Sequence, residues 1–181
     1  MSSIVISGDT SGAITLSAPA VAGSNTITLP AATGTVMVSG NMPAFSAYAS
    51  ASQTLANTVF TKIQLNVEEF DTANAFDSTT NYRFTPLVAG YYQINGLVSV
   101  GGTTGINYIA SIYKNGSEYK RGNQLGPNPA GTNGVCVCSL LYLNGSTDYV
   151  ELYGYQGSTI SQSTSSGSSL IYFNGSLVRG A

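Results

Sequence analysis

The segment Asn81-Tyr82-Arg83-Phe84-Thr85-Pro86-Leu87-Val88-Ala89-Gly90-Tyr91-Tyr92-Gln93-Ile94 carries the most specific structural information in the chain. It places Phe84 and Tyr92 on either side of Gly90, between two runs that are typical of β-strands. Gly90 lacks a Cβ where the chain passes from one strand to the next. The spacing of Phe84 and Tyr92 lets both rings face one interior from neighbouring strands. We therefore expect these three residues to mark a β-sheet core.

Outward from this segment, short apolar runs recur along the rest of the chain. They are separated by turn-rich segments and occupy residues 98–100, 108–113, 135–143, 149–155 and 170–178. No stretch has the pattern of a helix longer than one turn. Many short strands with Gly- and Asn-rich turns predict an antiparallel sandwich or barrel.

The spacing of Phe84, Gly90 and Tyr92 resembles the signature of the complement globular-head (q-subunit) family, a branch of the tumour-necrosis-factor-like jelly rolls. Four further pieces appear in the family's order, at residues 43–47, 61–66, 112–116 and 170–177. The resemblance covers 43–181 and implies an all-β antiparallel jelly-roll sandwich that forms a homotrimer. The family's collagenous or coiled-coil stalk is missing, so its immune partners do not carry over.

Residues 1–42 differ in composition and pattern from the rest of the chain. They contain no aromatic residue and have short β-branched runs at 4–6, 14–16, 26–29 and 35–38. Strands this short cannot enclose a core, so we expect them to pair with another chain or lie along a larger surface. The segment 28–36 also resembles N-terminal modules of bacteriophage fibre and virion proteins. We expect a short β-rich anchoring arm at 1–42, followed by the jelly roll at 43–181.

The composition limits the kinds of partner that the protein can bind. Charged residues make up 8% of the chain and the net charge is −2, against a usual charged fraction of about 25%. No cationic run exceeds Lys120-Arg121, which argues against binding to nucleic acid. No apolar run approaches the roughly 20 residues that cross a bilayer, so no membrane insertion is expected. The neutral, hydroxyl-rich surface suits a protein packed against copies of itself.

The N-terminus lacks the basic start and long apolar core of a secretory signal. We therefore expect the protein to be made in the host cytoplasm and released without secretion.

The chain contains no histidine, so the commonest general base and metal ligand is missing. We expect no enzyme activity and no cofactor. Half of the acidic residues lie in one segment, as Glu68, Glu69, Asp71 and Asp77. A solvated strand connection is the preferred interpretation of this cluster. Calcium binding is the main alternative because carboxylate oxygens suit that ion, and the resemblance implies a calcium site in some family members. A catalytic carboxylate pair is a weaker alternative.

Two cysteines, Cys136 and Cys138, flank Val137 in a strand-like run. Residues two apart on a strand point to the same face in nearly parallel directions, which is poor geometry for a disulfide bond. We expect both cysteines to be small buried residues of a core strand rather than a redox or metal site.

Three Asn-Gly-Ser triplets begin at Asn115, Asn144 and Asn174. Each follows or lies beside a strand run, and Asn-Gly is the preferred pair for a tight type I′ hairpin turn. We therefore expect turns there, with hairpins at Asn115-Gly116 and Asn144-Gly145. Glycosylation remains the alternative interpretation.

The tyrosines near the end of the chain divide by strand alternation. Val150 and Leu152 should point to the interior, and Glu151, Tyr153 and Tyr155 to the outer surface. Exposed aromatic residues serve as subunit contacts or as platforms for sugar rings. We expect Tyr153 and Tyr155 to be trimer contacts, with a glycan site as the alternative.

Three Gly- and Ser-rich loops are further candidates for recognition, at residues 101–107, 122–134 and 156–168. Pro127 and Pro129 should stiffen the second loop. Nothing in the sequence of the third loop holds it, so we expect it to be mobile.

These features together favour a structural protein of the virion surface over a catalytic protein. The expected form is a trimeric short head fibre or capsid decoration protein of a bacteriophage. Residues 1–42 would bind a capsid or tail structural protein, with the jelly roll projecting outward. The alternative is the receptor-binding tip of a tail fibre, whose loops bind host-surface carbohydrate.

Overall fold

The computed structural model describes residues 3–8, 10–21, 23–28, 31, 33–34, 36–101, 107–126 and 131–181. Its regular structure is β throughout, apart from one turn of 3₁₀ helix at Ser39–Asn41. The chain divides into two units, Met1–Gly34 and Thr35–Ala181. The second unit thus begins before Pro43, because Met37 already packs against its core.

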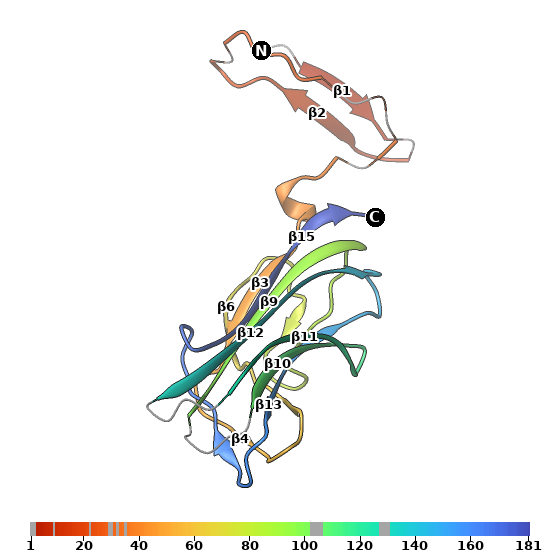
Figure 1. Ribbon diagram of the computed structural model, residues 1–181. Helices are drawn as coiled ribbons and strands as arrows, with labels where there is room; N and C mark the ends of the chain where they lie inside the picture. The colour runs from red at the N-terminus through yellow and green to blue at the C-terminus, as the bar shows by residue number, and fades with distance from the viewer. Residues whose placement is uncertain are drawn as a thin grey trace. The chain divides into compact units, whose positions relative to one another are not determined.

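The first unit contains one antiparallel hairpin, formed by β1 (Ser3–Ser7) and β2 (Ala13–Ser17) (Figure 1). Every side chain described in this unit is exposed. The first two apolar runs of the arm therefore form strands. The described residues of the other two runs, 26–28 and 36–38, form none, while Leu29 and Thr35 lie outside the described residues.

The second unit is an antiparallel jelly-roll sandwich, which confirms the predicted fold class. One sheet has five strands in the order β12-β9-β15-β3-β6. Their bounds are Thr132–Leu143, Gly90–Gly101, Ile171–Gly180, Ala44–Tyr48 and Val67–Asp71. Neighbouring strands of this sheet all pair antiparallel.

The second sheet has six strands in the order β11-β10-β13-β8-β7, with β5 also pairing with β13. Their bounds are Ser117–Leu125, Tyr108–Lys114, Val150–Gln156, Arg83–Phe84, Phe76–Asp77 and Thr61–Lys62. A small separate sheet pairs β14 (Gln162–Ser163) with β4 (Thr54–Leu55).

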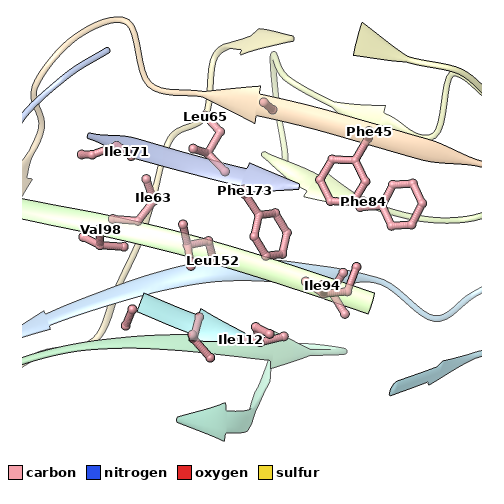
Figure 2. Close-up of a cluster of buried hydrophobic side chains, with 14 of the residues drawn as sticks. Phe45, Ile63, Leu65, Phe84, Ile94, Val98, Ile112, Leu152, Ile171 and Phe173 are labelled. Atoms are coloured by element: carbon pink, nitrogen blue, oxygen red, sulfur yellow. The ribbon is translucent and has the colours of Figure 1, made fainter. Parts of the chain in front are cut away.

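The core lies between the two large sheets, where apolar side chains from both gather (Figure 2). Phe84 stacks on Phe45 with ring centroids 4.2 Å apart, and meets Tyr92 edge-on at 5.7 Å. Phe84 and Tyr92 are both fully buried, so they do face one interior. Gly90 is the first residue of β9, where an added Cβ would lie 2.6 Å from Leu177 Cδ1. This glycine allows β9 and β15 to approach closely.

One side of the sandwich is closed by contact between edge strands of the two sheets. The backbone of β11 at Gly122 runs directly against β12, and an added Cβ there would lie 2.8 Å from the carbonyl carbon of Cys136. The Cys136 N–H also donates a hydrogen bond to Asn123 Oδ1 at 2.7 Å. The two sheets are thus held together along this edge by backbone contact as well as by the core.

The expectation that Cys136 and Cys138 are buried is wrong, because both side chains are exposed. The larger residues of β12 determine which face of the strand turns inward. Val135, Val137 and Leu141 all point into the core. Strand alternation then places the cysteines on the opposite, outer face.

The Asn-Gly pairs have three different roles. Asn115 and Gly116 form the tight turn between β10 and β11, both with positive φ. Asn144 and Gly145 do not join a hairpin, because β12 and β13 belong to different sheets. Instead, Asn144 Oδ1 accepts N–H hydrogen bonds that shape the connection between the sheets. Asn174 lies within β15 and is not in a turn.

The expectation of a mobile segment at 156–168 is also wrong, since buried side chains hold this loop. Gln156 Nε2 donates to the carbonyl oxygens of Leu55 and Ile160, at 3.2 and 3.0 Å. Gln156 Oε1 accepts from the N–H and the hydroxyl of Ser158. The Thr164 N–H donates to the carbonyl oxygen of Gln53 at 2.9 Å. Because the loop is held by hydrogen bonds from polar side chains, its sequence shows no apolar periodicity from which its order could be predicted.

Candidate interaction surface

The outer face of the five-stranded sheet is the most unusual surface of the second unit. Strand pairing aligns one row of side chains across all five strands, and the row is almost wholly apolar. It consists of Cys136, Leu97, Tyr172, Tyr48 and Val67. An antiparallel sheet with one buried face normally carries polar residues on the other. In this sheet, one row of the outer face is apolar instead.

The next row across the same face is polar in its middle. It runs through Cys138, Asn95, Asn174, Ser46 and Phe70. Asn95 Nδ2 donates to Asn174 Oδ1 at 3.1 Å, and the Ser46 hydroxyl donates to Glu69 Oε2 at 2.7 Å. A shallow hollow of about 250 Å³ lies over this row, with Phe70 among its lining residues.

Several large apolar side chains on this face are open to solvent. Their exposed fractions lie between 41% and 59%, and they are Phe70, Tyr91, Leu140, Tyr142 and Val178. Tyr91 and Tyr142 meet edge-to-face, with ring centroids 5.6 Å apart. Leu140 and Tyr142 lie on the edge strand β12, whereas Phe70 lies on β6 at the opposite edge of the sheet. Exposed apolar side chains of this kind are typical of surfaces that contact another molecule. We call this surface the five-stranded face.

The outer face of the six-stranded sheet carries Tyr153 and Tyr155, and both are half-buried. Tyr153 stacks on Tyr113 at 3.7 Å, and Tyr155 lies 4.9 Å from the ring of Phe60. Burial raises the pKa of the Tyr113 and Tyr153 hydroxyls above the usual value. Much of the ring surface available for a partner is therefore already covered within the chain.

Charges around this second face are paired. Lys62 Nζ lies 2.9 Å from Glu151 Oε1, and Arg121 Nη2 lies 2.7 Å from Glu118 Oε2. The hydrogen bond from Arg121 holds the pKa of the Glu118 carboxyl below its usual value. Arg121 also lies over the ring of Phe60, 5.2 Å from its centroid. The sequence pattern did not single out Phe60 or Tyr113, because Phe60 lies in the connection before β5 and Tyr113 lies in β10, far apart in the chain.

The four acidic candidates for a calcium site accept hydrogen bonds from different groups nearby. Asp71 accepts hydrogen bonds from backbone N–H groups of residues 73, 75 and 76, and Asp77 from those of residues 79 to 81. The backbone donors at Thr80 and Thr79 lower the pKa of Asp77. Glu69 accepts from the Ser46 hydroxyl, and Glu68 from the Ser78 hydroxyl. Two of these carboxylates therefore shape turns in their own backbone.

Within the described part of the chain, no three His, Cys, Asp or Glu side chains gather where a metal ion could bind. The same residues include no helix long and apolar enough to cross a membrane. Of the candidate loops, 102–106 and 127–130 lie outside the described residues, Pro127 and Pro129 among them.

Comparisons with known proteins support the fold at low sequence identity. No protein-family model matches the sequence. No curated protein matches it either. The globular domain of zebrafish complement 1qA protein is 18% identical, with a TM-score of 0.56 over 77% of this chain and 99% of its own. Eiger TNF from S. frugiperda is 8% identical, with a TM-score of 0.59 over 77% of this chain and 93% of its own. Murine APRIL, also 8% identical, has a TM-score of 0.59 over 76% of this chain and 99% of its own. At these identities the likeness shows a shared jelly-roll fold.

Proposed function

We propose that this jelly roll is the head of a non-catalytic, homotrimeric protein of a bacteriophage surface. In this proposal the protein is a short head fibre or capsid decoration protein. Its N-terminal residues bind a capsid or tail structural protein, and the jelly roll projects outward. The protein is made in the host cytoplasm and is placed on the virion surface.

The observation that carries this proposal is the exposure of large apolar side chains on the five-stranded face. Burial of apolar surface contributes about 25 cal/mol for each Å² removed from water, so exposed Leu140 and Tyr142 side chains favour contact with another molecule. Another copy of the same chain is a partner that is present wherever the protein is made. The low charged fraction of 8% also leaves little electrostatic repulsion between copies.

The N-terminal hairpin supports attachment to a larger structure. Isolated two-stranded hairpins are marginally stable in water, and the described side chains of this unit bury no core. The jelly roll, in contrast, has a complete core of its own. The hairpin is therefore the part of the chain that most needs a partner, which suits a role in anchoring.

A second candidate function is a receptor-binding tip that recognises carbohydrate, and the hollow at Phe70 favours it. Amide and hydroxyl groups beside an aromatic ring suit a sugar, which offers hydroxyls and an apolar ring face. Asn95, Asn174 and Ser46 supply the polar groups there. This hollow lies on the five-stranded face, so the two functions compete for one surface.

Sedimentation of the full-length protein at micromolar concentration tests the assembly. We expect a trimer, and a folded monomer for Leu140→Glu, because the new charge would be buried at the contact. Leu125→Glu is the matched control on β11, where the leucine is 39% exposed, and it should remain a trimer. A monomeric wild-type protein would contradict the proposal. Dissociation of Tyr153→Ala with Tyr155→Ala, but not of Leu140→Glu, would move the contact to the six-stranded sheet.

Imaging of labelled particles tests the location. Antibodies against the jelly roll should decorate the capsid surface of particles whose genome encodes the chain. Label confined to the tips of tail fibres would support the receptor-binding candidate instead. Purified particles without any label would rule out both.

A further inference from the structure

The N-terminal hairpin has one wholly aliphatic face. Strand pairing places Ile4 opposite Leu16 and Ile6 opposite Ile14. Residues two apart on a strand share a face, so all four side chains lie on the same side of the hairpin. Their exposed fractions are 65%, 58%, 56% and 68% in the same order. We call this surface the aliphatic face.

The opposite face of the hairpin differs in chemistry. Val5 is its one large apolar residue, paired with Thr15, and Ser7 lies opposite Ala13. The hairpin is therefore amphipathic, with large aliphatic groups on one side and mostly small or hydroxyl-bearing groups on the other. Such a division predicts a partner on the aliphatic side and a different environment on the other.

The aliphatic face also has a shape that side chains can fill. At its turn end lies a hollow of about 240 Å³, bordered by Ile6 and Ile14 and by Ser7, Gly8, Ser11, Gly12 and Ala13. The Gly8 N–H closes this turn by donating to the carbonyl oxygen of Gly12 at 3.0 Å. Ile4 and Leu16 project from the other end of the same face. One surface thus offers both projecting side chains and a place to receive them.

We infer that the aliphatic face is a contact between the hairpins of different copies of this chain. The inference rests on the proposed trimer, which would hold three hairpins at high local concentration. Asp9 is the sole charged residue before Lys62, so the hairpin carries almost no charge that could select an unlike partner. Hairpins packed face to face would supply the additional layer that a two-stranded sheet needs for stability.

This arrangement assigns separate tasks to the two sides of the hairpin. The aliphatic faces form a small second core among the copies. The hydroxyl-bearing faces and the outer strand edges remain available for a protein of the particle, which can add strands to them.

Two adjacent residues give a matched pair of variants for cross-linking. Ile6 and Val5 are 56% and 58% exposed but point to opposite faces. Each is changed to cysteine in full-length protein whose exposed Cys136 and Cys138 are replaced by serine. Diamide oxidises two thiols to one disulfide and takes up the two electrons and two protons. We expect Ile6→Cys to give covalent dimers of the chain, at a yield at least tenfold above that of Val5→Cys.

Hydrogen exchange in the full-length protein gives an independent measurement. The amides of β1 and β2 should be protected in the trimer. Ile6→Thr should speed their exchange about tenfold, whereas Val5→Thr should change it little, since both substitutions retain a β-branched side chain. Both variants should sediment as wild type, because the jelly roll also holds the assembly.

The outcomes separate this inference from the proposed function. A trimer without cross-links at residue 6, or with unprotected hairpin amides, overturns the inference and leaves the proposed trimer intact. Protected amides in monomeric Leu140→Glu also overturn it, because the chain then covers its own aliphatic face. A wild-type monomer without cross-links removes both.

Discussion

Tyr92 couples the ionisation of one buried side chain to the stability of the whole sandwich. Its ring is fully buried against Phe84, and its hydroxyl donates to the carbonyl oxygen of Val88 at 2.7 Å. Burial raises the pKa of Tyr92 from 10.0 to about 12. The folded protein therefore holds this proton more tightly than the unfolded chain does. The stability gained is fully present below pH 10 and is lost as the pH rises from 10 to 12.

A comparison of wild-type protein with Tyr92→Phe tests this coupling. At pH 8 the variant should be less stable by about 1 kcal/mol, the usual contribution of one hydrogen bond. Between pH 10 and pH 12 the wild type should lose on the order of 2 kcal/mol more than the variant. Denaturant unfolding at a series of pH values measures both effects. Parallel stability curves for the two proteins would show that Tyr92 does not titrate with unfolding.

Single residues also show where sequence reasoning succeeded and failed. The spacing of Phe84, Gly90 and Tyr92 predicted a shared interior, and the structure places both rings there. The prediction placed the side chains of Cys136 and Cys138 in the core, whereas the core-facing side chains of β12 are the valines. Cysteine and valine are both apolar, so alternation alone did not show which face of the strand is buried. Side-chain volume resolves the ambiguity, since the larger valines fill the core better.

At the scale of elements, the contact between β11 and β12 depends on one position without a side chain. A Gly122→Ala change would bring a methyl group into the backbone of Cys136, and backbone cannot move aside as a flexible side chain can. We expect a loss of about 1–3 kcal/mol, as for other overpacked sites. Gly134→Ala on β12 is the control, because its Cβ would lie 3.7 Å from Leu97 Cδ1, an ordinary contact.

Thermal unfolding of the two glycine variants should therefore separate clearly. Gly122→Ala should melt several degrees below wild type, whereas Gly134→Ala should melt near it. Faster hydrogen exchange in β11 of the first variant would place the damage at this edge. Equal melting of both variants would show that the two strands can separate without cost.

The predictability of each element follows from how much of it is buried. Apolar runs predicted the strands β9, β10, β12, β13 and β15, and the family resemblance predicted β3. All six strands contribute to the core. The hairpin at Asn115-Gly116 implied a strand after the turn, but the length of β11 was not predicted, because this strand has no buried residue and so no alternation. The apolar five-stranded face was also missed, because its rows combine residues from five strands and appear only when the register is known.

For the whole molecule, the division into two units predicts independent behaviour. A chain beginning at Thr35 should fold, melt like the jelly roll and remain a trimer, but should no longer attach to its particle. A chain beginning at Pro43 is the useful comparison, because it also lacks Met37, which packs against the core. Loss of that buried contact should lower its stability by about 1–3 kcal/mol.

Three measurements check these expectations. Sedimentation tests the trimer, unfolding tests the stability, and binding to particles stripped of the protein tests attachment. If the chain from Thr35 bound particles as well as full-length protein, attachment would belong to the jelly roll. If that chain failed to fold, the two units would not be independent.

The position of β15 has a consequence for how the protein is made. β15 is the last strand of the fold, yet it lies between β9 and β3 in the five-stranded sheet. Until the ribosome has released this strand, β9 and β3 each have one unpaired edge, and the sheet remains in two pieces. The five-stranded sheet therefore cannot close before β15 has emerged from the ribosome. During that interval the open edges can pair with other nascent chains, so slower translation should not improve the yield of folded protein, whereas lower expression should.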